Sequence, residues 1–288
     1  MWFKKSIVNT EQKNTDNILN SILTNGVNVS IEELLPYQSK TSLINLAANK
    51  NLHSRLSGNY LSRSKGRGME FDEVRHYQTG DDIRAIDWRV TARTGKTHTK
   101  LFREEVERPV LIATDLTASM KFGSQLLFKS VQASHIAALV AWHGMARGDR
   151  IGGVVFNDKN HCELKPRSRK AGVLHYLHAL SQIHNVVDKS LTRQSIDFLH
   201  AFEENCARLR QLARPGSLVY LITDAQQLTT ESLRHLTQIS QHCELIVCLV
   251  SDPLEQNLPK SKSKLNVALT DGQQRQQLLL GDVSVAKQ

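Results

Sequence analysis

Three oxygen-bearing side chains follow one apolar segment of the chain, spaced two residues apart. Residues 110–114 have the composition of a buried strand, and the chain continues directly through Asp115, Thr117 and Ser119. A carboxylate and two hydroxyls in one loop can converge on a single point, and such hard oxygen ligands suit Mg²⁺ or Mn²⁺. The spacing therefore predicts a site for Mg²⁺ or Mn²⁺ at these three residues.

A second acid is expected from a neighbouring strand. Residues 217–223 form another apolar segment, and Asp224 follows it directly. The carboxyl ends of parallel strands meet along one edge of an open α/β sheet, so Asp224 is predicted to bind the metal directly or through water. A further hydroxyl is expected from the loop before the helix at 195, where Ser195 and Thr192 are both candidates.

The same residue types have an ordinary structural role as helix caps and turn formers. On its own, D-x-T-x-S is more often a cap or turn than a metal site, and the matched acid at Asp224 favours the metal interpretation. No G-x-S-x-G elbow and no nucleophile beside an evident base accompany these residues, so we predict a binding protein rather than an enzyme. The alternatives are a structural interaction domain with an inactive metal site and, less favoured, a metal-assisted hydrolase.

The elements that must position these side chains alternate regularly from residue 109 onward. Short apolar segments of strand character occupy residues 110–114, 150–156, 217–223 and 244–250, and residues 161–165 can pair beside the second of them. Helical patterns lie at residues 124–147, 169–183, 195–212 and 229–241. Strands that alternate with helices of this length indicate crossover connections. We therefore predict an α/β fold with a mainly parallel sheet and helices on both faces.

Composition divides the chain into four parts. They are a polar N-terminal extension (1–30), an N-terminal helix with a loop and strand module (31–108), the α/β domain (109–252), and a linker, hairpin and tail (253–288). The N-terminal helix is expected over residues 31–56, where Ser30 can supply the cap. The hairpin is expected around Asp271 and Gly272, because Asp-Gly between two short apolar runs favours a tight turn.

Composition and charge are those of a soluble globular protein. The chain has 288 residues and a net charge of +9, but its basic residues are dispersed and no aromatic stacking motif lies among them. Direct nucleic-acid binding is therefore not predicted. No apolar run approaches the ~18 residues that span a bilayer, and the N-terminus lacks a signal-peptide pattern. Four cysteines without a C-x-x-C pair favour a reducing compartment, so we predict a cytoplasmic protein.

A long charged motif precedes the α/β domain. Residues 68–93 read G-M-E-F-D-E-V-R-H-Y-Q-T-G-D-D-I-R-A-I-D-W-R-V-T-A-R. This stretch resembles the signature of the bacterial domain of unknown function 58 family, whose typical form is G-x-E-F-x-x-x-R-x-Y-x-x-G-D-D-x-R-x-I-D-W-x-x-x-A-R. The resemblance extends over roughly residues 30 to 282 and is too long to arise by chance.

The resemblance implies a von Willebrand factor A-like fold, which is a Rossmann-like α/β arrangement. Members of the family are often encoded beside AAA+ ATPases of the MoxR type, which implies an accessory factor that works with such an ATPase and its protein clients. In the family's metal-ion-dependent adhesion motif D-x-S-x-S, Thr117 stands in place of the usual serine. Asp224 corresponds to the motif's later Asp, whereas residues 190–197 offer no clean counterpart of its middle threonine.

The signature segment also has a physical interpretation of its own, because its charges are too dense for ordinary surface composition. We expect a salt-bridged module with Trp88 and Tyr77 as apolar anchors. The charges can pair only with one another as scaffolding, or they can form a face on which a partner docks. In the second case the partner-binding residues are Arg75, Asp81, Asp82, Arg84, Asp87, Trp88 and Arg93.

Overall fold

Two compact units make up the chain in the computed structural model. The large unit combines Met1–Leu46 with Pro109–Gln288, and the small unit is Ala47–Arg108. The residues described are 19, 21–43, 69–104, 107–186, 198–256, 265–270 and 275–280.

The large unit is built on a five-stranded sheet in the order β5-β4-β3-β6-β7. The strands are β3 (Pro109–Asp115), β4 (Arg150–Phe156), β5 (His161–Arg167), β6 (Leu218–Thr223) and β7 (Glu244–Leu249). Only the pairing of β5 with β4 is antiparallel among these strands. The central strand β3 and its neighbour β6 are almost wholly buried, as expected of continuous apolar runs in a parallel sheet. The predicted α/β class and mainly parallel sheet are confirmed.

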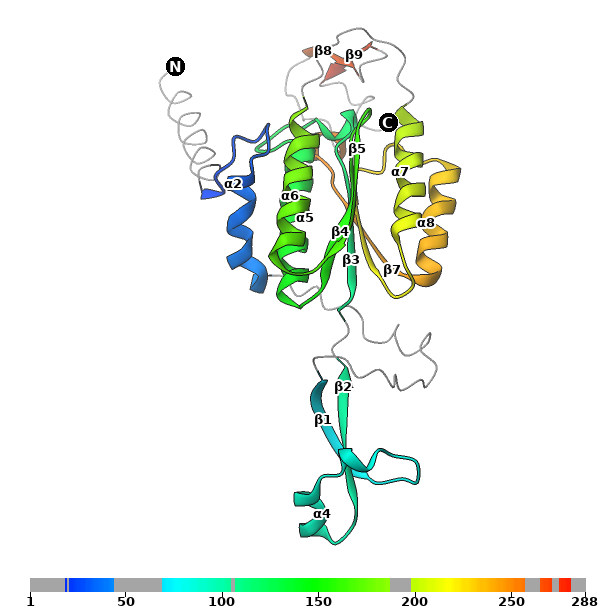
Figure 1. The fold of residues 1–288 in the computed structure, drawn as a ribbon. Coiled ribbons are helices and arrows are strands. Elements are labelled where there is room, and N and C mark those ends of the chain that lie inside the picture. The colour runs from blue at the N-terminus through cyan, green and yellow to red at the C-terminus, as the bar shows by residue number, and fades with distance from the viewer. Residues whose placement is uncertain are drawn as a thin grey trace. The chain divides into compact units, whose positions relative to one another are not determined.

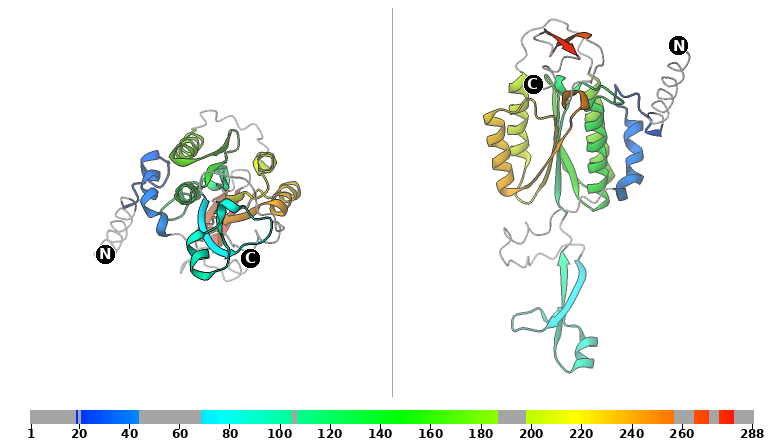
Figure 2. Two further views of the ribbon diagram at one scale, coloured as in Figure 1. Left: turned by 60° about the horizontal axis from the view of Figure 1, so that its bottom comes forward. Right: turned by 180° about the vertical axis from the view of Figure 1, so that it is seen from behind.

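Helices cover both faces of this sheet. One face carries α5 (Lys129–Ala146) and α6 (Arg169–Asn185), and the other carries α7 (Phe198–Leu212) and α8 (Thr230–His242) (Figure 1). Figure 2 shows the same two helical layers from behind. Successive side chains of β3 point to opposite faces of the sheet, so the strand contributes to both hydrophobic clusters. Ile112 packs in the cluster of Trp142, and Leu111 packs in the cluster of Phe202. The sheet edge at the end of β3 is thus held from both sides.

The segment before the sheet is shorter than predicted and belongs to the large unit. Instead of one helix over 31–56, the chain forms α2 (Ile31–Leu34) and the 3-10 helix η1 (Leu35–Leu43), because Pro36 lacks the N–H that would continue the α-helix. Ser30 and Glu33 form the expected capping box. The grouping of this segment with the signature module was wrong, since Trp142 of α5 donates its indole N–H to the Leu34 carbonyl at 3.1 Å. Residues 44–56 lie outside the described part.

The start of α5 also differs from the prediction. The helical pattern begins at residue 124, but the helix begins at Lys129. Tertiary contacts hold the preceding loop out of the helix: Asp252 accepts hydrogen bonds from the backbone and hydroxyl of Ser124. The Phe128 N–H donates to the Gly26 carbonyl at 2.9 Å. These contacts place Lys129 in the first turn of α5, at the same edge of the sheet as the end of β3.

The small unit is an antiparallel hairpin with two helical turns in its loop. Its elements are β1 (Met69–His76), η2 (Ile83–Ala85), α4 (Trp88–Thr94) and β2 (His98–Glu104). The segment was expected to hold only loops and short strands, yet α4 forms because the Asp87 carboxylate caps its N-terminus. Gly95 ends α4 with φ 71°, a left-handed conformation that glycine adopts without strain.

The C-terminal part contains α9 (Pro253–Gln256), β8 (Leu265–Thr270) and β9 (Arg275–Leu280). The two strands pair antiparallel as the predicted hairpin, and they form their own sheet rather than an edge of the large one. The expected turn at Asp271 and Gly272 lies outside the described residues. No helix in the described part is long and apolar enough to cross a bilayer.

Candidate functional site

The side chain of Asp115 lies at the end of β3 and is completely buried. Its Oδ1 accepts hydrogen bonds from the Thr117 N–H at 3.0 Å and from the Thr117 hydroxyl at 2.6 Å. Its Oδ2 accepts from the Thr223 hydroxyl at 2.7 Å. Because β3 and β6 are adjacent parallel strands, their ends bring Asp115 and Thr223 together. The carboxylate is therefore fixed by three donors, with both of its oxygens engaged.

The hydroxyls of Thr117 and Ser119 come together in front of that carboxylate. Their oxygens lie 3.3 Å apart, in the loop around η3 (Ala118–Met120). Thr117 points its proton at Asp115, so the lone pairs of its oxygen remain free to accept. Neighbouring oxygen ligands of an octahedral Mg²⁺ with bonds of 2.0–2.1 Å are about 3 Å apart, close to the spacing seen here. Ser119 is partly exposed, whereas Thr117 is completely buried, so Ser119 is the member of the pair that solvent reaches.

Burial of Asp115 has an electrostatic consequence. Desolvation raises the pKa of this carboxyl from 3.8 to about 6, the three hydrogen bonds oppose the rise, and the charge of Asp224 adds to it. The ionised form of Asp115 is therefore disfavoured in the folded protein. A cation bound at the neighbouring hydroxyls would offset that penalty, so the donor set and its charge both fit a hard divalent ion.

The predicted second acid, Asp224, is paired with an internal lysine. Lys129 Nζ lies 2.8 Å from Asp224 Oδ2, and each of the two side chains is 2% exposed. The Lys129 ammonium also donates to Glu255 Oε1. Burial lowers the pKa of Lys129, but its hydrogen bonds to Asp224 and Glu255 outweigh burial and raise the pKa above its ordinary value. An ammonium ion thus already neutralises the acid that was expected to serve the metal.

The remaining predicted ligands cannot be placed beside the site. Ser195 and Thr192 lie outside the described residues. Within the described ranges, no group of three or more His, Cys, Asp or Glu side chains could hold a metal ion. Among the described residues, the predicted ligands that come together at this edge of the sheet are the Thr117 and Ser119 hydroxyls, with Asp115 behind them.

A third acid at the same edge was missed from the sequence. Asp158 follows β4, and its Oδ2 accepts the N–H of Ala118, which lies between the two candidate hydroxyl ligands, at 2.9 Å. Burial raises the pKa of Asp158 above its usual value. The signal was available, because Asp158 follows an apolar strand just as Asp115 and Asp224 do. The pattern of an acidic residue after an apolar strand therefore also predicts Asp158 at this edge of the sheet.

In the small unit, the signature aspartates support the local fold. Asp81 accepts from the Gln78 N–H at 2.8 Å and from Arg75 at 2.7 Å, and the pKa of its carboxyl lies below the ordinary value, first because of the backbone hydrogen bond. Asp82 caps η2 and Asp87 caps α4. The charges are thus scaffolding at these positions, through caps more than through salt bridges.

The two predicted apolar anchors of the small unit differ in burial. Tyr77 is partly buried, and its hydroxyl donates to the Asp81 carbonyl at 3.3 Å. Trp88 is 67% exposed and Ile83 is 66% exposed, so the prediction that Trp88 anchors the module was wrong. Trp88 is the first residue of α4. Among the described residues Arg84 and Arg93 have no acidic partner, so their charges remain available on the surface.

Residues 73–286 match the family described as "Protein of unknown function DUF58". The chain belongs to the DUF58 family. The match covers every strand of the large sheet and most of the signature segment, so the candidate site lies inside the family's shared region.

Individual relatives of this DUF58 chain add little beyond the family. It is 33% identical over 114 residues to the uncharacterized proteins Mb1516 of Mycobacterium bovis and MT1527 and Rv1480 of Mycobacterium tuberculosis. That stretch is 40% of this chain and 36% of each relative, so the chain spans little more than a third of the curated relatives it matches.

Two solved structures resemble the chain at low sequence identity. An aerotolerance-related membrane protein from Bacteroides fragilis is 16% identical, with a TM-score of 0.39 over 60% of this chain and 80% of that one. The conserved hypothetical protein BatB from Bacteroides thetaiotaomicron is 15% identical, with a TM-score of 0.38 over 62% of this chain and 83% of that one.

Proposed function

We propose that this DUF58 chain is a protein-binding adaptor of the von Willebrand factor A type with a metal-ion-dependent adhesion-type site. Thr117 and Ser119 would hold Mg²⁺ or Mn²⁺, with Asp115 behind them. The observation that carries the proposal is the pair of hydroxyl oxygens 3.3 Å apart in front of a buried carboxylate. The bound ion would supply a positive charge that a carboxylate of the partner can complete.

The chain's own residues prepare this loop for binding rather than for catalysis. The Asp115 carboxylate accepts a hydrogen bond from the Thr117 hydroxyl, which leaves the lone pairs of that hydroxyl available to a metal ion. Thr223 locks the Asp115 carboxylate from the neighbouring strand, and Asp158 fixes the backbone of Ala118 between the two hydroxyls. Groups held in place before binding lose little freedom when a ligand arrives, which favours affinity.

The partner we propose is an AAA+ ATPase of the MoxR type, with its protein clients, in the cytoplasm. This part rests on the family resemblance. The small unit offers a second contact surface, because Trp88 and Ile83 are exposed beside Arg84. Exposed aromatic and arginine side chains are common among the residues that dominate binding energy in protein interfaces.

A metal-independent interaction domain is the second candidate function. It is favoured by the ion pair of Lys129 and Asp224, since the ammonium removes negative charge from the edge of the sheet where a divalent ion would bind. In that case the same loop and the small unit would contact a partner through their own polar groups. The two candidates make opposite predictions for the effect of a chelator.

Calorimetric titration of the full chain with Mn²⁺ tests the metal. Thr117→Val and Ser119→Ala remove one ligand oxygen each, and Thr237→Val is the matched control, because its exposed hydroxyl bonds only within α8. We expect saturable binding by wild type and the control, and at least tenfold weaker binding by the two site variants. At a concentration of about 100 times Kd the ion should stabilise the wild type by about 2.7 kcal/mol.

Capture of the MoxR-type ATPase of the same organism, with and without EDTA, tests the partner. Capture that EDTA abolishes supports the adhesion-type site. Capture that EDTA leaves unchanged, together with no Mn²⁺ binding, would favour the metal-independent domain. Failure to capture the ATPase in either buffer would contradict the partner assignment while leaving the titration result to decide the metal.

A further inference from the structure

One side of helix α4 in the small unit is exposed and carries two short rows of side chains. The exposed residues are Trp88, Arg89, Ala92 and Arg93. Successive residues of an α-helix are turned by about 100°, so these four positions lie within an arc of about 140°. Trp88 and Ala92, one turn apart, form an apolar row, and the two arginines, also one turn apart, form a basic row beside it. Val90 and Thr91, on the other side of the helix, are half-buried.

Hydrogen bonds hold the other side of α4 to the hairpin. The Thr91 hydroxyl accepts the His98 N–H of β2 at 3.1 Å, and the Asp87 N–H donates to the His98 carbonyl at 2.9 Å. The Asp87 carboxylate also caps the first turn through the N–H groups of Arg89 and Val90. In Figure 1, α4 lies at the loop end of the hairpin. The exposed side of the helix therefore has a fixed position within the small unit.

The acidic side chains near α4 are already engaged. Asp87 accepts the two backbone N–H groups of the cap, and its Oδ2 lies 3.7 Å from Lys100. The hydrogen bond from the Val90 N–H is the first cause that lowers the pKa of Asp87, and Lys100 is the cation that adds to it. Asp81 and Asp82 each accept a backbone N–H of their own turn. By register, the acidic positions of the strands lie toward the other end of the hairpin, and they are Glu70, Asp72, Glu73 and Glu104.

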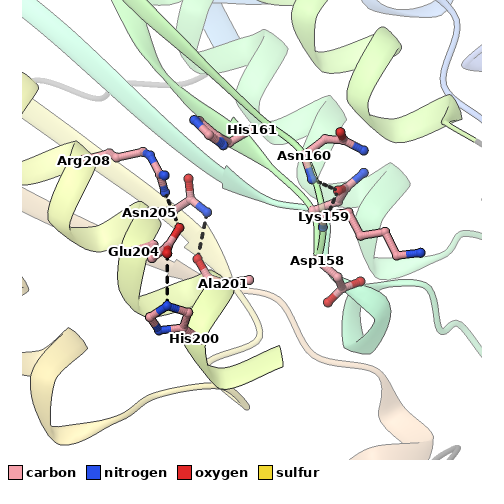
Figure 3. A pocket seen from close by; sticks show the side chains of 10 residues that line it. Asp158, Lys159, Asn160, His161, His200, Ala201, Glu204, Asn205 and Arg208 are labelled. Atoms are coloured by element: carbon pink, nitrogen blue, oxygen red, sulfur yellow. Dashed lines mark hydrogen bonds and ion pairs between the residues drawn. The ribbon is translucent and has the colours of Figure 1, made fainter. Parts of the chain in front are cut away.

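The two arginines of α4, in contrast, have no counter-charge. No ion pair of Arg89 or Arg93 occurs in the described part of the chain. Arg208 of α7 is different, because it donates to Glu204 one turn away on the same helix, as Figure 3 shows. Guanidinium groups without a partner attract carboxylate or phosphate groups, which they bind through paired N–H donors. The basic row therefore favours an anionic partner.

The apolar row distinguishes a protein partner from a nucleic acid. Surfaces that bind single-stranded nucleic acid stack successive bases on several aromatic side chains along a basic groove. Helix α4 offers one aromatic residue, Trp88, and the next member of the row is the methyl group of Ala92. Such a row suits an aliphatic side chain of a protein. Trp88 is 67% exposed, and exposed Trp and Arg side chains are common among the residues that dominate protein interfaces.

We propose that the exposed side of α4 binds an acidic amphipathic segment of a protein partner. Carboxylates one helical turn apart on the partner would pair with Arg89 and Arg93, and an apolar side chain beside them would cover Trp88. The inference rests on the proposed function only in taking the ligand to be a protein, and it requires no metal. Two helical turns form a small interface, so this contact is weak by itself and adds to other contacts of the same partner.

Fluorescence anisotropy of a labelled peptide, titrated with the full chain in EDTA, tests this surface. The probe is an alanine-based helical peptide with leucine and glutamate in two adjacent i, i+4 rows. Two matched peptides carry glutamine in place of glutamate, or alanine in place of leucine. We expect the first peptide to bind saturably and each matched peptide to bind at least tenfold more weakly. Binding of the acidic peptide should also weaken as salt is raised, because exposed charges are screened.

Variants of the chain locate the binding surface. Trp88→Ala and the double variant Arg89→Gln with Arg93→Gln should each weaken binding of the acidic peptide at least tenfold. Lys165→Gln with Lys170→Gln removes the same charge from exposed positions of the large unit and should bind as wild type does. The peptide should also protect Trp88 from acrylamide quenching. Comparison with Trp88→Phe separates its fluorescence from that of the other tryptophans.

Three outcomes would overturn the inference. They are absence of saturable binding by the acidic peptide, equal binding of the glutamate and glutamine peptides, and binding that the arginine double variant leaves unchanged. Binding of a single-stranded uridine oligonucleotide more than tenfold tighter than the acidic peptide would make this a nucleic-acid surface. If Trp88→Ala fails to fold, the arginine double variant decides alone. Because the probes are peptides and chelator is present throughout, neither the metal nor the ATPase enters these results, so this inference and the proposed function can fail separately.

Discussion

The hydroxyl of Thr223 donates to Asp115 Oδ2 at 2.7 Å and so ties together the ends of two adjacent parallel strands. Both residues are buried, at 1% and 0% exposure. The bond therefore connects the loop after β3, which carries Thr117 and Ser119, to the loop after β6, which carries Asp224. We therefore expect this hydrogen bond to contribute both to the stability of the fold and to the position of the Asp115 carboxylate.

Replacement of Thr223 by valine keeps the shape of the side chain, removes this donor and also removes the acceptor of the Ala225 N–H. We expect Thr223→Val to lower the free energy of unfolding by about 1–3 kcal/mol, because a buried carboxylate oxygen is left without a partner. The pKa of Asp115 should rise further, since the Thr223 hydrogen bond is one of the interactions that lower it. Urea unfolding at neutral pH measures the first effect, with Thr237→Val as the surface control. Unchanged stability would show that the bond contributes nothing net.

Asp115→Asn is expected to stabilise the protein at neutral pH in the absence of metal. The folded pKa of about 6 lies above the unfolded value of 3.8, so the stability linked to this group is complete below pH 3.8 and is lost as pH rises through about 6. Asparagine avoids this loss, and the gain should be about 1–3 kcal/mol at pH 7.5. The same variant should lose its thermal response to Mn²⁺. A lower melting temperature in EDTA would contradict the assigned direction of the shift.

His135 on α5 should make the fold sensitive to mild acid. Burial lowers its pKa from 6.5 to about 4, with the charge of Lys40 adding to the effect, and Nδ1 lies 2.8 Å from the Tyr37 hydroxyl. The unfolded chain binds a proton near pH 6.5 while the folded chain does not, so stability linked to His135 falls as pH drops from 6.5 to about 4. In His135→Phe the slope of unfolding free energy against pH should be smaller over this window, as measured by urea unfolding at several pH values. An identical slope would mean that His135 titrates normally.

The strands of the large sheet could be predicted from the sequence because each one is a continuous run of apolar residues. The apolar run into Asp115 predicted both the end of β3 and the start of the loop with the candidate metal ligands, and the run into Asp224 predicted the end of β6. The convergence of these acids on one edge followed from parallel topology alone. Asp158 also follows an apolar strand, so its position at this edge of the sheet could have been predicted from the sequence in the same way.

Contacts between distant segments account for what the sequence did not predict. The helical pattern at residue 124 was overridden because Asp252, 128 residues away, takes Ser124 out of the helix. The pairing of Lys129 with Asp224 joins positions 95 residues apart, and a lysine in the first turn of a helix opposes the helix dipole, so no local signal announced it. Trp88 was expected to be buried from its type, whereas residues 74–100 of the described part include no buried apolar side chain that could form a core around it.

The ion pair beneath the site supplies the last prediction. Lys129→Met should lower the free energy of unfolding by about 3–5 kcal/mol, because Asp224 and Glu255 then lose a shared buried cation. The double variant Lys129→Met with Asp224→Asn should recover a large part of this loss, since one of the two stranded charges is gone. Urea unfolding of the four proteins in the cycle gives the coupling energy directly. Additive effects would mean that the 2.8 Å contact contributes no net stability. Asp224 could then act as a metal ligand without loss of stability.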